Sequence, residues 1–138
     1  MRKKGFFFNA SALLLSLSLS ACFDTHPIGQ FEQSIQGHYD SDLSSNGLYS
    51  IVASIHHGAS LWRTSDKERV YNWNHDKGQY SQIDQVSLSG SGNIGITNIQ
   101  KTLVFWSSQT GQSMDYWEVS SPVTCIAQNF NGSLYEIV

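Results

Sequence analysis

One segment of this sequence occurs twice, and the second copy follows the first after 44 residues. Each copy carries two tryptophans 11 residues apart, Trp62 with Trp73 in the first copy and Trp106 with Trp117 in the second. The first tryptophans of the two copies are 44 residues apart, and so are the second tryptophans. Because such large side chains determine how the chain around them packs, the fold must be built from repeated units of about this length.

Both copies divide into short runs of apolar and β-branched residues separated by turn signals such as Asn-Gly, Gly-Ser-Gly and Thr-Gly. Runs of this kind favour strands, and the signals between them favour tight turns. We therefore expect four strands in each copy and the start of a third copy. The expected strands cover residues 39–43, 49–54, 59–62 and 69–73 in the first copy, 83–88, 93–97, 102–106 and 113–117 in the second, and 123–128 in the third.

Four antiparallel strands in a repeat of about 40–45 residues are typical of a β-propeller blade. The predicted fold class is all-β: a partial β-propeller of two four-stranded blades and the start of a third, within residues 37–138. The third copy stops inside its second strand at Val138. Because a closed propeller takes at least about four blades, we expect either a truncated product of a longer propeller or self-association through open strand edges.

The first 21 residues have the order of a secretory signal peptide. Arg2, Lys3 and Lys4 are basic, a short apolar stretch follows, and small residues precede Cys22. The apolar stretch is shorter than the roughly 20 residues that a membrane-spanning helix needs, so we expect the peptide to be cleaved. Residues 22–36 are then expected to form a tether before the repeats.

The quartet Leu19-Ser20-Ala21-Cys22 resembles the bacterial lipobox. The resemblance implies cleavage just before Cys22 and attachment of acyl chains, such as palmitate, to that residue. Several acyl chains on one residue hold a protein at a membrane permanently. In such lipoproteins an Asp after the Cys favours the inner membrane, whereas this sequence has Phe23. The resemblance therefore implies the periplasmic face of the outer membrane.

The repeats resemble those of WD-repeat proteins, in particular the bacterial envelope type. The stretch from Leu103 to Gly111 carries apolar residues, a Trp and a Thr-Gly turn in the order found at the third strand of such a blade. The family's Asp after the Trp is replaced by Arg63 and Ser107, and its tight-turn Asp between the second and third strands is replaced by His56-His57 and Ile99-Gln100. WD-repeat blades contain a buried hydrogen-bond network of His, Asp, Ser or Thr, and Trp. The departures imply that this network cannot form here in its usual way, so we expect apolar packing to supply most of the cohesion.

Seven residues are expected to determine the blade structure: Trp62, Trp106, Trp73, Trp117, Gly47, Gly92 and Gly132. The tryptophans are expected to pack between blades. Trp73 and Trp117 lie on the outer strands, so they are also candidates for a partly exposed binding surface. Cys125 lies in an alternating run that is typical of a strand, and we expect it to be a small buried core residue.

No residue pattern indicates catalysis, a metal or a cofactor. His56 and His57 are adjacent, and neighbouring residues of a strand face opposite sides, so they cannot chelate a metal together in an extended chain. Asp40 and Asp42 share one strand face, but we expect them to be solvated. The net charge of −3 and the lack of a basic patch after the signal peptide argue against nucleic acid as a partner.

These observations favour a non-enzymatic, membrane-anchored periplasmic scaffold that binds other envelope proteins. Rigid repeats with variable loops are suited to the display of binding surfaces. Two alternatives stay open. One is a fragment of an enzymatic propeller of the quinoprotein type, whose blades also carry a Thr-Gly turn followed by Trp. The other is a non-functional truncated product.

Overall fold

The structure is a computed structural model, and it describes residues 37–76, 82–133 and 135–138. The predicted signal peptide, Cys22 and the tether up to residue 36 lie outside the described residues. Within the described part of the chain, no helix is long and apolar enough to cross a membrane.

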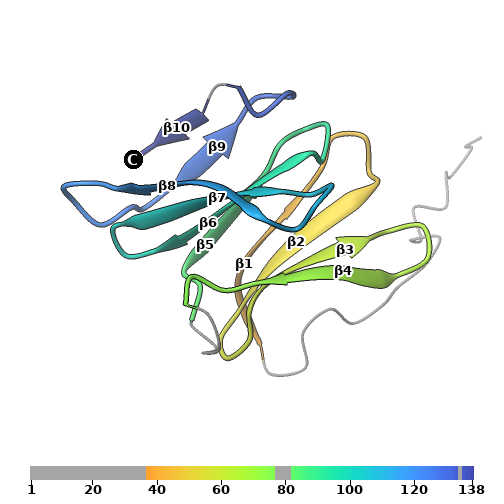
Figure 1. Ribbon diagram of the computed structural model, residues 1–138, viewed down its shortest axis with the longest axis horizontal. Coiled ribbons are helices and arrows are strands. Elements are labelled where there is room, and N and C mark those ends of the chain that lie inside the picture. Colours follow the sequence, from red (N-terminus) through yellow and green to blue (C-terminus); the bar gives the residue numbers. More distant parts are fainter. Residues whose placement is uncertain (1–36, 77–81, 134) are drawn as a thin grey trace, which may run out of the picture. The chain divides into compact units, whose positions relative to one another are not determined.

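Three antiparallel sheets make up the described part of the chain (Figure 1). The first sheet has the strand order β1-β2-β3-β4, the second has the order β5-β6-β7-β8, and the third contains β9 and β10. The strands are β1 (His38–Leu43), β2 (Tyr49–Ser54), β3 (Gly58–Arg63), β4 (Glu68–Trp73), β5 (Gln85–Leu88), β6 (Ile94–Ile99), β7 (Thr102–Ser107), β8 (Ser113–Glu118), β9 (Ile126–Gln128) and β10 (Tyr135–Ile137). Within each sheet, strands that follow one another in sequence are paired.

This arrangement confirms the predicted all-β fold with two four-stranded units and the start of a third. Two strands are shorter than expected: β5 begins at Gln85 rather than at residue 83, and β9 begins at Ile126 rather than at residue 123. The second difference has a structural reason. The N–H of Val123 donates to the carbonyl of Gln100, at 2.8 Å, so the chain at this point is bonded to the β6–β7 turn of the preceding sheet.

The two four-stranded sheets repeat each other even in their irregularities. Trp62 lies opposite Ser50, and Trp106 lies opposite Gly95 in the corresponding strand pair. In both sheets the register between the third and fourth strands shifts immediately before this tryptophan. Because such a bulge bends and twists the strand that carries it, its recurrence means that the two copies share a strand geometry as well as a sequence period.

Successive sheets face one another across two hydrophobic cores. The larger core lies between the first and second sheets, and its buried residues include Ile51, Leu61, Trp73, Val86, Leu88 and Trp106. The smaller core lies between the second sheet and the third, and its buried residues are Ile96, Leu103, Phe105 and Val123. Because side chains of a strand alternate between its two faces, the second sheet contributes to both cores.

Two tryptophan rings stack in the larger core. Trp73 of β4 lies on Trp106 of β7 with the ring centroids 5.5 Å apart and the planes 9° from parallel. The indole N–H of Trp73 donates to the carbonyl of Gly111 at 3.1 Å, and the hydroxyl of Tyr71 donates to the carbonyl of Gln109 at 2.9 Å. The outer strand of the first sheet is therefore fixed to the β7–β8 turn of the second by packing and by hydrogen bonds.

Gly95 leaves the room that Trp73 occupies, since a Cβ at position 95 would lie 2.6 Å from the ring atom Cζ3 of Trp73. We predict that Gly95→Ala lowers the free energy of unfolding by about 1–3 kcal/mol through overpacking, measured by urea denaturation. In a Trp73→Phe background, which lacks this ring atom, the same substitution should cost less. An equal cost in both backgrounds would contradict the described packing.

Candidate functional site

A hydrogen-bonded network surrounds Trp106 in the second sheet. Its indole N–H donates to Thr97 Oγ1 at 2.8 Å, and His75 Nε2 lies 2.9 Å from the same oxygen. Three of the four side-chain types in the network of WD-repeat blades thus come together, so hydrogen bonds add to the expected apolar packing. The Asp is missing, because Ile99 and Gln100 occupy the turn that would carry it. The sequence pattern does not single out His75, which lies in the loop after β4.

The first sheet provides a different partner for its own tryptophan. Val52 stands at the position that Thr97 holds in the second sheet, and it carries no hydroxyl. The indole N–H of Trp62 donates instead to Ser60 Oγ at 2.8 Å. Trp62 is half-buried, whereas Trp106 is buried. The two tryptophans therefore match in position but not in their hydrogen-bond partners.

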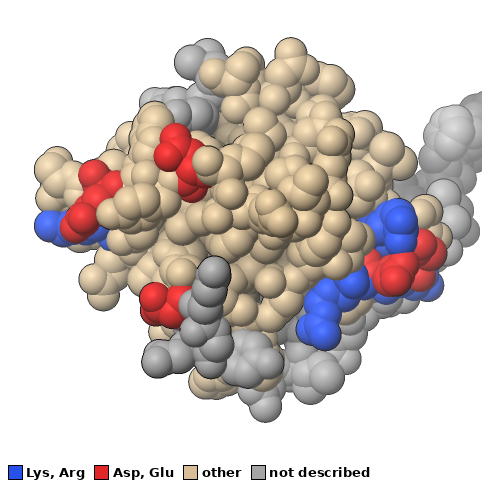
Figure 2. Space-filling model, in the orientation of Figure 1, with Lys and Arg blue, Asp and Glu red and all other residues tan. Residues whose placement is uncertain are grey.

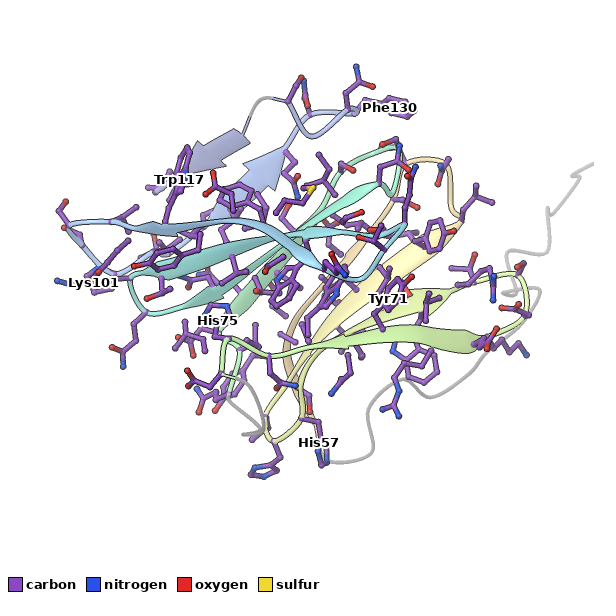
Figure 3. The ribbon with its side chains drawn as sticks, viewed as in Figure 1. His57, Tyr71, His75, Lys101, Trp117 and Phe130 are labelled. Atoms are coloured by element: carbon purple, nitrogen blue, oxygen red, sulfur yellow. The ribbon has the colours of Figure 1, made fainter. Side chains whose placement is uncertain are left out.

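Burial lowers the pKa of His75 below its ordinary value, because the charged imidazolium would lose much of its hydration. A hydrogen bond with Thr97 and the carboxylates of Asp76 and Asp84 act in the opposite direction but are smaller effects. A neutral imidazole has one acceptor nitrogen, so the Thr97 hydroxyl can donate to Nε2 while it accepts from Trp106. His75 lies beside the second sheet, as Figure 3 shows.

The first strands of the three sheets, β1, β5 and β9, line an open groove of about 690 Å³, which we call the inner groove. Its described lining includes the carboxylates of Asp40, Asp42 and Asp84 and contains no Lys, Arg or His. Exposed apolar side chains also line the groove: Tyr39, Leu43 and Phe130. On the face shown in Figure 2, Lys and Arg side chains appear only near two opposite sides. The inner groove is thus acidic with an apolar part.

Asp40 and Asp42 connect the first sheet to the second. Asp40 Oδ2 accepts a hydrogen bond from the N–H of Val86 at 3.0 Å, and Asp42 Oδ2 accepts one from the N–H of Leu88 at 2.7 Å. Both N–H groups belong to positions of β5 that do not bond to β6, because bonded positions alternate along an antiparallel pair. The expectation that the two carboxylates are simply solvated is therefore wrong.

The same two carboxylates also bond to their own strand. The N–H of Ser41 donates to Asp40 Oδ1, and the N–H of Leu43 donates to Asp42 Oδ1, each at 2.8 Å. Each carboxylate therefore binds one outward N–H of β1 and one outward N–H of β5. Because free N–H groups on a strand edge are a template for pairing with other chains, these side chains close both edges at this part of the inner groove.

The two outer-strand tryptophans differ in exposure. Trp117 is 40% exposed and packs against Phe105, with the ring centroids 5.2 Å apart. Trp73 is only 1% exposed, so the expectation that it forms part of a binding surface is wrong. Trp73 is buried because its ring stacks on both Trp106 and Tyr71.

A second groove, of about 560 Å³, lies beside the loop that follows β4. Its described lining comes from that loop and from β6, β7 and β8, and it includes His75, Asp76, Trp106, Met114 and Tyr116. Met114 and Tyr116 are exposed. This groove adjoins the network around Trp106, so a change in the network would alter its wall.

The remaining residues singled out from the sequence lie in turns or on the surface. Gly47, Gly92 and Gly132 all have left-handed backbones, with φ of 69°, 77° and 70°, a conformation that glycine adopts without strain. Cys125 is exposed, because it lies on the wall of the inner groove, and the expectation that it is a core residue is wrong. His57, near the end of the β2–β3 turn (Figure 3), is exposed, and the described residues contain no group of three potential metal ligands.

No family model matches this sequence, and no curated protein matches it. Solved structures do match the fold. The β-propeller domain of Cps50 (Swd1) from Myceliophteria thermophila matches 80% of this chain with a TM-score of 0.63 and 13% identity, over 33% of its own length. The WD40 repeats of RRP9 match 71% of this chain with a TM-score of 0.58 and 13% identity, over 30% of their length. Hydrazine synthase from Kuenenia stuttgartiensis matches 82% of this chain with a TM-score of 0.59 and 10% identity, over 32% of its length.

The chain spans about a third of the length of these solved structures. At this level of identity the likeness shows the fold alone. The stacked four-stranded sheets are blades of a partial β-propeller, and the matching structures include a β-propeller domain and a set of WD40 repeats. The predicted propeller fold is thereby confirmed.

We predict that Asp42→Ala lowers the free energy of unfolding by about 1.5–3 kcal/mol, because Leu88 and Leu43 lose a charged hydrogen-bond acceptor. Asp42→Asn should cost less, since one amide oxygen remains. Asp66→Ala is the matched control: it removes an acid of the exposed β3–β4 hairpin that pairs with Arg63, and exposed ion pairs contribute little. Urea denaturation compares the variants, and equal effects of Asp42→Ala and Asp66→Ala would contradict the bridging role.

The lowered pKa of His75 predicts a loss of stability in acid. The unfolded chain takes up a proton near the ordinary pKa of 6.5, whereas the folded chain does so only at lower pH, so the free energy of unfolding falls as the pH drops from above 6.5 through the folded pKa. His75→Gln should remove this part of the pH dependence. Urea midpoints at several pH values test it, and identical slopes for the two proteins would contradict it.

Proposed function

We propose that this chain is a non-enzymatic scaffold that binds other proteins of the cell envelope. The observation that supports this function best is the propeller-type stack of sheets, which holds three strands rigidly around one open groove. A rigid frame that presents exposed apolar and charged side chains is suited to protein binding. Phe130 and Leu43, both exposed at the inner groove, provide such apolar contact area.

The scaffold is attached to the periplasmic face of the outer membrane by acyl chains on Cys22. The support is the order of basic, apolar and small residues before Cys22, with Phe23 after it. Residues 23–36 then link the anchor to the first described strand. An anchor of several acyl chains gives permanent attachment, so the scaffold would stay at the membrane.

We predict that Cys22→Ser releases the protein from the membrane fraction of a Gram-negative host. Mass spectrometry of the wild-type protein should show an acylated Cys22 as the first residue. Cys125→Ser is the matched control, since this exposed thiol is not part of the lipobox, and it should leave the protein in the membrane fraction. An unmodified Cys22, or a chain that retains residues 1–21 after export, would contradict the anchor.

Partner binding is tested in the same cells by photo-crosslinking. A photoreactive phenylalanine analogue at position 130 lies at the inner groove, and the same analogue at Glu118 lies on the exposed end of β8. Discrete crosslinked products from position 130 that are absent from position 118 support the scaffold function. Identical products from both positions, or none from position 130, would contradict it.

A further inference from the structure

At the inner groove, no carboxylate of the described residues closes the free edge of β9. The register of the paired strands places Gln85 and Ser87 of β5 where β1 has Asp40 and Asp42. Gln85 is neutral, and its Oε1 is buried without a partner among the described residues. Ser87 Oγ lies 3.4 Å from Asp42 Oδ2, to which it donates. Neither residue therefore repeats the bridging that the two aspartates provide.

Asp84, the third acid of the groove, is engaged elsewhere. Its Oδ1 accepts from Gln82 Nε2 at 3.0 Å, and its Oδ2 accepts from the N–H of Gln100 at 2.9 Å. Both partners lie in the second sheet or the loop before it. The edge of β5 is thus bonded to carboxylates of the first sheet, whereas no described carboxylate of the second sheet bonds to the edge of β9.

β9 directs backbone groups into the groove. Cys125 and Val138, which lie directly beyond the paired ends of β9 and β10, exchange two backbone hydrogen bonds of 3.1 Å and thus form a bonded position of the same ladder. Because bonded and non-bonded positions alternate, Ile126 and Gln128 turn their N–H and C=O groups away from β10. Both residues line the inner groove. No described residue bonds to these backbone groups.

Side-chain amides add further unsatisfied atoms at the same place. Gln128 Nε2 and Oε1 are buried without partners among the described residues, as is Gln85 Oε1. Both residues line the inner groove. Buried polar atoms without partners are costly and usually have a ligand, water or ion as partner. The groove edge of β9 nevertheless offers donors and acceptors together through the backbone groups of Ile126 and Gln128, which match the alternating N–H and C=O groups of an extended backbone.

The charges of the groove define which side chains such a backbone would carry. Asp40, Asp42 and Asp84 make the groove acidic, and its described lining has no basic side chain. The exposed rings of Tyr39 and Phe130 lie in the same lining and can contact the methylene stem or the cation of a basic side chain. Lys and Arg meet both requirements, whereas Asp and Glu would be repelled.

We propose that the inner groove binds an extended polypeptide segment with Lys or Arg side chains by strand addition to the free edge of β9. This inference rests on the proposed scaffold function, because it names the kind of partner that the groove takes. Main-chain hydrogen bonds to Ile126 and Gln128 supply the attachment, as in other cases of strand addition. The groove acids select the basic side chains.

The first test uses the full-length Cys22→Ser variant, which cannot be acylated at this position. It is titrated into two fluorescent peptides, one of alternating Val and Lys and one of alternating Val and Glu. The Lys peptide should bind and the Glu peptide should not. Failure of the Lys peptide to bind would overturn the inference. The proposed scaffold function would stand if position 130 still gave discrete crosslinked products, so the two failures can be distinguished.

Two charge variants separate strand addition from simple attraction. Gln85→Asp places a carboxylate where it can accept a hydrogen bond from the N–H of Ile126, as Asp40 does from the N–H of Val86. Because this closes the edge of β9, the variant should bind the Lys peptide roughly tenfold more weakly despite its added negative charge. Ser41→Asp adds the same charge to the groove lining away from β9 and should leave binding equal or tighter. Tighter binding by both variants would overturn strand addition.

A proline variant tests the backbone contact directly. Ile126→Pro removes the N–H that faces the groove, and the bonds between β9 and β10 remain because they involve other positions. It should also weaken Lys-peptide binding roughly tenfold. Unfolding midpoints of all variants establish that they are folded. Unchanged binding by both Ile126→Pro and Gln85→Asp, with loss of binding in high salt, would show non-specific charge attraction and overturn the inference.

Discussion

The stacking of Trp73 on Trp106 is the contact on which the rest of the structure depends. A single four-stranded repeat cannot bury its apolar face alone, so each repeat needs its neighbour. The stack joins the outermost strand of the first sheet to the third strand of the second, and Gly95 provides the room for it. Once the outer strands are fixed in this way, the inner strands lie side by side. The inner groove therefore depends on this packing together with the hydrogen bonds of Asp40 and Asp42 to β5.

Where the inner strands meet, polar groups determine what the surface can do. Every antiparallel sheet leaves alternate backbone groups unpaired at its two edges. Asp40 and Asp42 satisfy these groups between the first two sheets, and Gln85 and Ser87 do not do so for the third. The residues at two equivalent positions, Asp40 and Asp42 in one repeat and Gln85 and Ser87 in the next, therefore determine whether the neighbouring strand edge is closed or open. Such local departures from a repeat are the natural place to look for binding.

Much of the fold could be predicted from the sequence, because period, turn glycines and strand patterns are local signals. The boundaries of β2, β4 and β7 follow from them almost unchanged. The roles of Asp40 and Asp42 could not be predicted, since their partners lie 46 residues away in the chain and are backbone groups without a sequence signal. The role of His75 could not be predicted for a similar reason, because its hydrogen-bond partner Thr97 lies 22 residues away in the sequence. Exposure of Cys125 depends on the groove, which exists only after the sheets are stacked.

The position of Trp73 also determines the order in which the molecule can be completed. Synthesis proceeds from the N-terminus, so the first sheet is made before the residues on which its outer strand packs. Until Trp106 and Gly111 have been added, Trp73 and the apolar face formed by Ile51 and Leu61 have no partner. The smallest unit that can fold cooperatively is therefore a pair of repeats and not one, and a nascent chain ending between them would depend on chaperones that cover apolar surface.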